Sequence, residues 1–303
     1  MTRIGVVIAA SIFAASLPAS EITDTGVPVS VPVTIKSTDA SSPQLTVDNI
    51  LVSQNRQHRQ IISLTPLGGS TGSQLWLLID DGLTKNFGSQ LADVKQFVLS
   101  LPSTIQVGIG YIHNGFVQQA QPLTADHNLA VKALRLPSGP PGIAADPYTA
   151  MRVLIQKWPA TQSAREIVFI SNGADPIYGA GPQDPYLESA LHAAQKAGVV
   201  VYSIFYPGSG AYGHSRRQGF WGQYNLSEMT EATGGELYWI GLQPPVSLTP
   251  YFNDLTRRLD GEYLLTFLAK PEHKSGLESV DVKSELPHVK VAAPSEVYVP
   301  AIQ

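Results

Sequence analysis

The chain has 303 residues, of which 43% are hydrophobic and 15% are charged, and its formal net charge is −4. This composition can build a sizeable core and argues against global disorder, and the acidic balance gives no support for nucleic-acid binding. Cysteine is absent, which excludes disulfides, a lipid-modified cysteine and thiolate metal sites.

The first 20 residues have the pattern of an export signal. Arg3 is followed by an apolar or small stretch, residues 4–17, which is shorter than the roughly 20 residues that span a bilayer as a helix. We therefore expect an exported protein of the periplasm, the cell envelope or the extracellular space. The alternatives are a buried helix or an uncleaved anchor, which would be the chain's only contact with membrane.

The segment that follows has a β pattern. Val29, Val31 and Val33 alternate with smaller or polar residues, and this period of two is typical of a strand. Two further apolar runs, residues 50–52 and 61–64, are separated by a polar segment, as they would be in a hairpin. A connector rich in glycine and serine then leads to the middle of the chain.

From residue 74 onward, we expect strands to alternate with helices. The candidate strands are residues 74–80, 105–112, 166–171 and 199–205, and the candidate helices are residues 87–100, 147–158 and 185–197. Such alternation predicts an α/β fold with a mostly parallel sheet and helices on both faces. A later helix is predicted to begin at Asn225, because Asn225 and Glu228 together resemble a capping box.

After Gly261 the chain returns to short strand-like stretches, interrupted by Pro271, Gly276 and Pro294. We expect the two β ends of the chain to pack together as a small sandwich-like region beside the central domain. The predicted division is a signal peptide at 1–20, an N-terminal β segment at 21–70, an α/β domain at 71–260 and a C-terminal β segment at 261–303.

Four motifs follow one another in the central segment. The first is Asp80-Asp81-Gly82-Leu83-Thr84, directly after the first strand, and the others are residues 166–173, 193–204 and 226–235. In order and spacing they resemble the motifs of von Willebrand factor A (VWA) domains, whose first strand is followed by Asp-x-Ser-x-Ser. The flanking segments 45–48, 263–267 and 294–300 resemble those of exported VWFA-related proteins of the acidobacterial type. The resemblance covers most of residues 28–300 and implies a Rossmann-like VWA domain.

The resemblance also implies a metal-ion-dependent adhesion site for Mg²⁺ or Mn²⁺, in which a partner's carboxylate completes a shell of oxygen ligands. The matching positions hold Asp80, Thr84 and Asn172, whereas Gly82 stands where a hydroxyl ligand is expected. Residues 144–146 are Ala-Ala-Asp and lack the expected threonine. We therefore expect a degenerate site that has lost its ion, and no cofactor.

A neighbouring carboxylate could rescue the metal site, and Asp81, Asp146 and Asp175 are the candidates. Each has an alternative role. Asp81 would be solvated at the end of its strand, Asp146 would cap the helix that begins with Pro147, and Asp175 would lie in a turn.

The sequence does not favour catalysis or nucleotide binding. It has no Gly-x-Ser-x-Gly elbow between a predicted strand and a helix, no His-Glu-x-x-His motif and no glycine-rich phosphate loop. We therefore predict that the chain is not an enzyme and binds no nucleotide.

Residues 207–224 are rich in glycine and aromatic residues, and we predict a long loop there. It contains Arg216, Arg217, Phe220 and Trp221, and Arg and Trp are enriched at binding hot spots. This loop is the best metal-independent candidate for a protein-binding surface. The alternative is that Phe220 and Trp221 fold back onto the edge of the domain.

Together these features predict an exported VWA-type protein-interaction or adhesion module with a degenerate metal site and a protein partner of unknown identity. Two alternatives stay open. One is a secreted hydrolase that uses the strand-end carboxylates Asp80, Asp81 or Asp146. The other is a structural envelope protein without a specific ligand.

Overall fold

The computed structural model describes residues 26–37, 44–67, 72–139, 146–161, 163–175, 184–207, 216–241, 243, 245–272 and 274–301. The expected signal peptide lies outside these residues, so export stays a prediction. Within the described ranges, no helix is both long enough and apolar enough to cross a bilayer.

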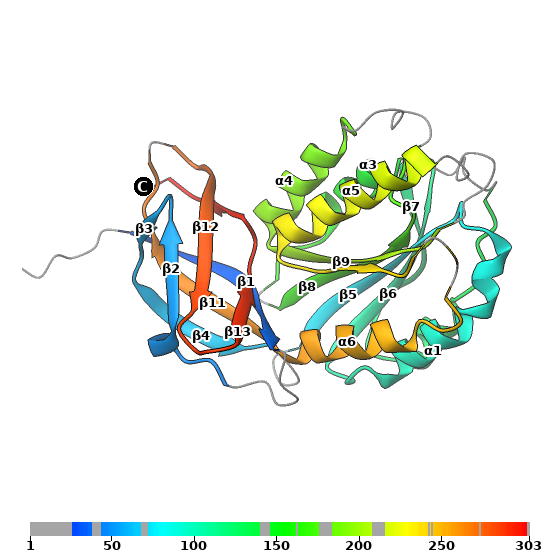
Figure 1. Ribbon diagram of the computed structural model, residues 1–303, viewed down its shortest axis with the longest axis horizontal. Helices are drawn as coiled ribbons and strands as arrows, with labels where there is room; N and C mark the ends of the chain where they lie inside the picture. Colours follow the sequence, from blue (N-terminus) through cyan, green and yellow to red (C-terminus); the bar gives the residue numbers. More distant parts are fainter. Residues whose placement is uncertain are drawn as a thin grey trace, which may run out of the picture.

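The middle of the chain folds around a six-stranded sheet (Figure 1). β7 pairs with β6 in the antiparallel sense, and the other neighbours in the sheet are parallel. In spatial order the strands are β10 (Leu237–Trp239), β9 (Val199–Phe205), β8 (Ala164–Ser171), β5 (Ser73–Asp80), β6 (Ile105–His113) and β7 (Phe116–Thr124).

Helices cover both faces of this sheet, which explains why β5 is an uninterrupted apolar run. Leu75, Leu77 and Ile79 pack on one helical layer, and Trp76 and Leu78 pack on the other. The first layer contains α1 (Leu91–Ser100), α2 (His127–Lys132) and α6 (Thr249–Asp260), and the second contains α3 (Pro147–Lys157), α4 (Leu187–Ala197) and α5 (Arg216–Thr233). A 3₁₀ helix, η2 (Lys85–Ser89), precedes α1.

The two ends of the chain form a separate β unit with its own apolar core. One sheet has the order β13 (Val289–Ala292), β1 (Val27–Ser37), β11 (Glu262–Ala269) and β4 (Ile61–Pro66). The other has the order β14 (Glu296–Val299), β12 (Gly276–Ser284), β2 (Ile50–Gln54) and β3 (Gln57–His58), and η1 (Val47–Asn49) precedes β2. Both sheets combine N-terminal and C-terminal strands, so the predicted fold class is confirmed: a mostly parallel α/β sheet with a small sandwich built from the flanks.

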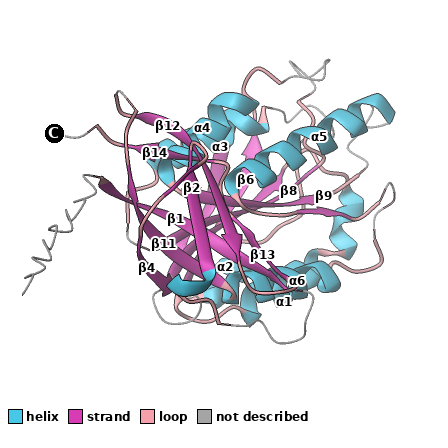
Figure 2. Cartoon of the chain, turned by 60° about the vertical axis from the view of Figure 1, so that its left-hand side comes forward, coloured by secondary structure: helices cyan, strands magenta, loops and turns pink. Residues whose placement is uncertain are grey.

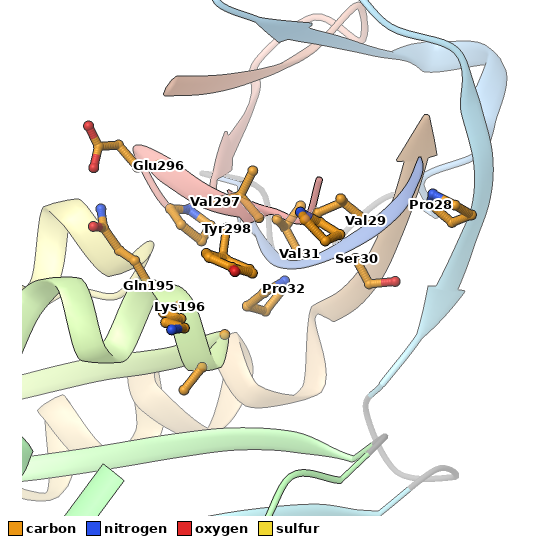
Figure 3. Close-up of a pocket in the computed structure, with 14 residues that line it drawn as sticks. Pro28, Val29, Ser30, Val31, Pro32, Gln195, Lys196, Glu296, Val297 and Tyr298 are labelled. Carbon is orange, nitrogen blue, oxygen red and sulfur yellow. The ribbon is translucent and has the colours of Figure 1, made fainter. Parts of the chain in front are cut away.

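A groove separates the sandwich from α4 (Figure 3). One wall is β1, which pairs with β13 only from Thr34 onward. Pro28 and Pro32 lie on the remaining stretch of β1 and line the groove. Because proline has no backbone N–H, these residues disfavour the addition of another strand at this edge. Across the groove, the Lys196 ammonium lies 4.9 Å from the centre of the Tyr298 ring.

The hairpin strand β7 was not among the predicted strands. The turn that joins it to β6 has positive φ at Asn114 and Gly115, as a two-residue hairpin connection requires. The strand itself is Phe-Val-Gln-Gln-Ala-Gln-Pro-Leu-Thr and is largely exposed. Its apolar residues do not alternate, so periodicity gave no signal for an edge strand of this kind.

The predicted loop at residues 207–224 is wrong in its second half, because α5 already begins at Arg216. Residues 208–215 lie outside the described ranges. Asn225 does not cap a helix but lies buried inside α5. Gly222 allows the backbone of α5 to lie against the Asn172 carbonyl, where a Cβ atom would collide. Tertiary packing therefore overrides the low helix propensity of glycine.

This packing predicts opposite effects for two glycines of the same helix. Gly222→Ala should lower the free energy of unfolding by about 1–3 kcal/mol, because the added methyl group overpacks the contact with Asn172. Gly219→Ala should raise it by up to about 1 kcal/mol, because its methyl group enters open space and alanine favours the helix. Urea denaturation of the two variants measures both values. If residues 219 and 222 lay in a loop instead, the two substitutions should change the free energy of unfolding to the same extent.

Candidate functional site

The candidate site lies at the carboxyl ends of β5 and β8, the edge where parallel α/β sheets carry their ligands. Asp80 is the last residue of β5 and Asp81 follows it, and Ser171 and Asn172 stand at the matching point of β8. The parallel pairing of the two strands brings these residues together. Both aspartates are buried, with exposed fractions of 8% and 3%.

Both carboxylate oxygens of Asp80 accept hydrogen bonds from other groups of the protein. Oδ1 accepts from the Gly82 amide at 2.8 Å, and Oδ2 accepts from the Ser171 hydroxyl at 2.9 Å. Burial raises the pKa of Asp80 to about 6, and the hydrogen bonds from Gly82 and Ser171 limit the rise. Ser171 was not a predicted site residue. Its position directly before Asn172 in the second motif was the available signal.

Asp81 is not solvated, contrary to the alternative that the sequence favoured for it. Its buried carboxylate forms an ion pair with Arg135, whose side chain is partly exposed. The Arg135 Nη1 atom lies 2.6 Å from Oδ1, and Nη2 lies 3.3 Å from Oδ2. The Ser138 amide donates to Oδ1 at 2.8 Å and its hydroxyl donates to Oδ2 at 3.3 Å. Burial alone would raise the pKa of Asp81, but the bonds and charge of Arg135 outweigh it and lower the pKa.

The side chain of Tyr111, on β6, packs against Arg135 and holds it in place. The guanidinium carbon lies 3.8 Å from the centre of the Tyr111 ring, a cation–π contact. The Tyr111 hydroxyl donates to the Arg135 carbonyl at 2.8 Å and accepts from the Arg135 amide at 2.6 Å. Sequence reasoning missed Arg135, because it follows α2 and is 54 positions away from Asp81. Only the fold brings the two together.

The remaining predicted ligands are engaged in local structure. The Asn172 Oδ1 atom accepts from the Ala174 amide at 3.0 Å. Asp146 caps α3, as its alternative role predicted, and its Oδ1 atom accepts from the Thr149 amide at 3.0 Å. Thr84 is half-buried at the start of η2, and Asp175 is buried. Residues 144 and 145 lie outside the described ranges.

These donors do not fit a divalent cation. An octahedral Mg²⁺ or Mn²⁺ requires several convergent oxygen ligands of which some are anionic. The oxygens of Asp80 and Asp81 already accept hydrogen bonds from the protein, and Gly82 has no side chain that could act as a ligand. Across the described part of the chain, no group of three or more histidine or acidic side chains is arranged to hold a metal ion.

The carboxyl edge also carries a second group of acidic residues between α3 and α4. Asp184 is buried, and its Oδ1 atom accepts from the Tyr186 amide at 2.8 Å. Burial, together with the negative charges of Asp175 and Asp146, raises the pKa of Asp184 to about 6, although its backbone hydrogen bonds lower it. The carboxyl edge of the sheet therefore collects several buried or partly buried carboxyl groups.

The four residues predicted as a contact surface lie in the first turns of α5. Arg216 and Arg217 begin the helix, and their side chains lie outside what the structure describes. Phe220 is 62% exposed, while Trp221 is half-buried. Tyr224, one turn further along α5, is also exposed. The surface is thus helical rather than a loop, and its role in binding stays a prediction.

Comparison with known proteins gives similarity to solved structures at low sequence identity. No protein-family model matches the sequence, and no curated protein matches it. A VWA domain, that of SpRpn10, is 14% identical and covers 60% of this chain and 94% of its own, with a TM-score of 0.40. An aerotolerance-related membrane protein from Bacteroides fragilis is 12% identical and covers 62% of this chain and 99% of its own, with a TM-score of 0.43.

The pilus adhesin SpaC from Lactobacillus rhamnosus GG, in its open conformation, is 8% identical to this chain, with a TM-score of 0.44. The similarity covers 89% of this chain but only 47% of the adhesin. The chain therefore spans about half the length of that protein.

The Arg135–Asp81 pair predicts a measurable coupling energy. Arg135→Ala should lower the free energy of unfolding by about 2 kcal/mol, because it leaves a buried carboxylate without its partner. In the Asp81→Asn background the same substitution should cost at least about 1 kcal/mol less. Denaturant unfolding of the four proteins in this double-mutant cycle gives the coupling.

Arg257→Ala is the matched control. Arg257 pairs with Asp254 at the same distance of 2.6 Å, but its side chain is 70% exposed, so its loss should cost no more than about 0.5 kcal/mol. A coupling energy for Arg135 and Asp81 that is no larger than this exposed pair's effect would contradict the role given to Arg135.

Proposed function

We propose that the chain is an exported VWA-type module that binds a protein partner without a divalent metal ion. The observation that carries this proposal is the Arg135–Asp81 pair. A permanent cation from the chain itself compensates the carboxylate at the end of β5, so the edge stays folded and charge-balanced without an ion from solution. The order of the four VWA motifs along the chain supports the assignment to a binding module.

The contact surface that we propose lies at the carboxyl edge and along the adjoining turns of α5. Gly222 fixes α5 against residues 172–174 beside the site, and Phe220 projects a largely exposed ring two residues earlier. On the other side of the site, Phe116 begins β7 and is 66% exposed. Exposed aromatic rings on rigid elements are typical anchors of protein interfaces.

We propose a binding module rather than a secreted hydrolase. The raised pKa of Asp80 is the feature that would favour acid–base catalysis. Its two oxygens, however, are bonded to Gly82 and Ser171, and the side chain is buried. A general acid must reach the substrate atom that it protonates, and Asp80 is not positioned to do so.

Partner capture from an envelope extract of the source organism tests the proposal. The tagged full chain should retain the same protein in Mg²⁺ and in EDTA, because no step of binding uses an ion. Phe220→Ser should abolish retention. The control is Leu129→Ser, which changes another exposed apolar residue, on α2 at the opposite edge of the sheet, and should leave capture intact.

Loss of capture in EDTA would overturn the metal-independent mode. Equal capture by Phe220→Ser and by the unchanged chain would move the contact surface away from α5.

A further inference from the structure

A pair of buried glutamates lies where the central domain meets the sandwich. Glu166 is near the amino end of β8, at the edge of the sheet opposite the candidate site. Glu262 is the first residue of β11, directly after α6. Their exposed fractions are 1% and 2%. In Figure 2 the strands β1 and β11 of the sandwich are on the near side of the molecule, with β8 and β9 of the central sheet beyond them.

The pair joins elements from both parts of the molecule. The Tyr202 hydroxyl, from β9 of the central sheet, donates to Glu262 Oε1 at 2.6 Å. The Thr34 hydroxyl lies 3.4 Å from the same Tyr202 oxygen, and Thr34 pairs with Glu262 across β1 and β11. Glu262 thus belongs to the sandwich by its backbone and to the central domain by its side chain.

Glu166 has the less favourable position. Neither of its carboxyl oxygens has a well-formed hydrogen bond among the described residues. The groups that act on it are the Glu262 carboxyl, which is a like charge when ionised, and the Ser73 hydroxyl at the start of β5. A buried carboxylate without a compensating partner is strongly disfavoured, so the neutral form is preferred here.

The neighbouring cations are committed elsewhere. From β1, Lys36 forms an ion pair with Glu236 at 2.8 Å, and from α6, Arg258 forms one with the same carboxylate at 3.1 Å. The groups packed against the pair from β5, β9 and β1 are the hydroxyls of Ser73, Tyr202 and Thr34. A proton is therefore what neutralises this pair.

We propose that Glu166 and Glu262 form a proton-dependent latch between the central domain and the sandwich. While the pair keeps a proton, two carboxyl groups can share the dry junction. Once both protons are lost, two like charges face each other without a cation, and the junction opens so that water reaches them.

The direction of the pH dependence follows from the same contacts. Burial raises the pKa of Glu262 to about 7, and burial together with the charge of Glu262 raises the pKa of Glu166 well above the ordinary value of 4.5. Below about 4.5 both groups are protonated in the folded and the unfolded chain, and the junction is fully stable. As the pH rises through about 7, the unfolded chain has already ionised, so the junction loses stability.

A distance measurement across the junction tests the latch. The chain has no cysteine, so spin labels can be attached at His192→Cys on α4 and Leu51→Cys on β2, both of which are exposed. Pulsed electron paramagnetic resonance should give one narrow distance at about pH 5 and added longer distances at about pH 9. In Glu166→Gln/Glu262→Gln, which cannot ionise, the distance should stay narrow at both values.

Two further variants separate a latch from a general loss of stability. Glu278→Gln changes a buried glutamate that is bonded within the sandwich, and it should open over the same pH range as the unchanged chain. Tyr202→Phe removes a hydrogen bond that favours ionised Glu262, so it should move the opening to higher pH.

The distance measurement also separates the latch from the titration of Asp80 and Asp184. Burial raises their pKa values as well, so they contribute to the pH dependence of melting, but both lie at the far edge of the sheet. The latch is overturned if the unchanged chain keeps one distance at both pH values, or if the double glutamine variant opens like it. If the double variant does not fold, Glu166→Gln alone should still remain closed at about pH 9, and its opening there would equally overturn the latch.

Discussion

Carboxyl groups buried at the ends of sheet strands set the main constraint on this molecule. A carboxylate withdrawn from water must be bonded, paired with a cation or protonated. The VWA-like arrangement that the sequence implied would meet this demand with a divalent ion. Here Asp80 accepts hydrogen bonds from an amide and a hydroxyl and has a raised pKa, and Asp81 forms an ion pair with Arg135. The site is therefore stable through contacts of the chain alone.

The same constraint has a different solution at the opposite edge of the sheet. At the carboxyl edge, Arg135 supplies a charge that persists at every physiological pH. At the junction with the sandwich, Glu166 and Glu262 have hydroxyl groups around them, and no ion pair with a cation is found for either among the described residues. Asp81 therefore keeps its charge partner at any pH near neutral, whereas the proposed latch depends on a proton.

The sequence predicted those parts of the fold in which local patterns and tertiary packing agree. β5 is buried on both faces, because its uninterrupted apolar run must be covered by a helical layer on each side. Asp146 caps α3 because its side chain and the following proline act within a single turn. In each case the information lies within a few neighbouring residues.

The parts that were missed depend on distant contacts. β7 is a polar edge strand, and its pairing with β6 rather than its own composition defines it. α5 begins earlier than its glycines indicate, because Gly222 fits against Asn172. Arg135 follows a short helix with no motif around it, and only the fold brings its side chain to Asp81. Long-range ion pairs of this kind have no signature in a single sequence.

Anomalous diffraction from crystals grown with Mn²⁺ tests the central claim most directly. The account predicts no manganese peak at the end of β5, with the Arg135 guanidinium against the Asp81 carboxylate and the Ser171 hydroxyl against Asp80. A manganese peak within coordination distance of the Asp80 carboxylate and the Thr84 hydroxyl would contradict it.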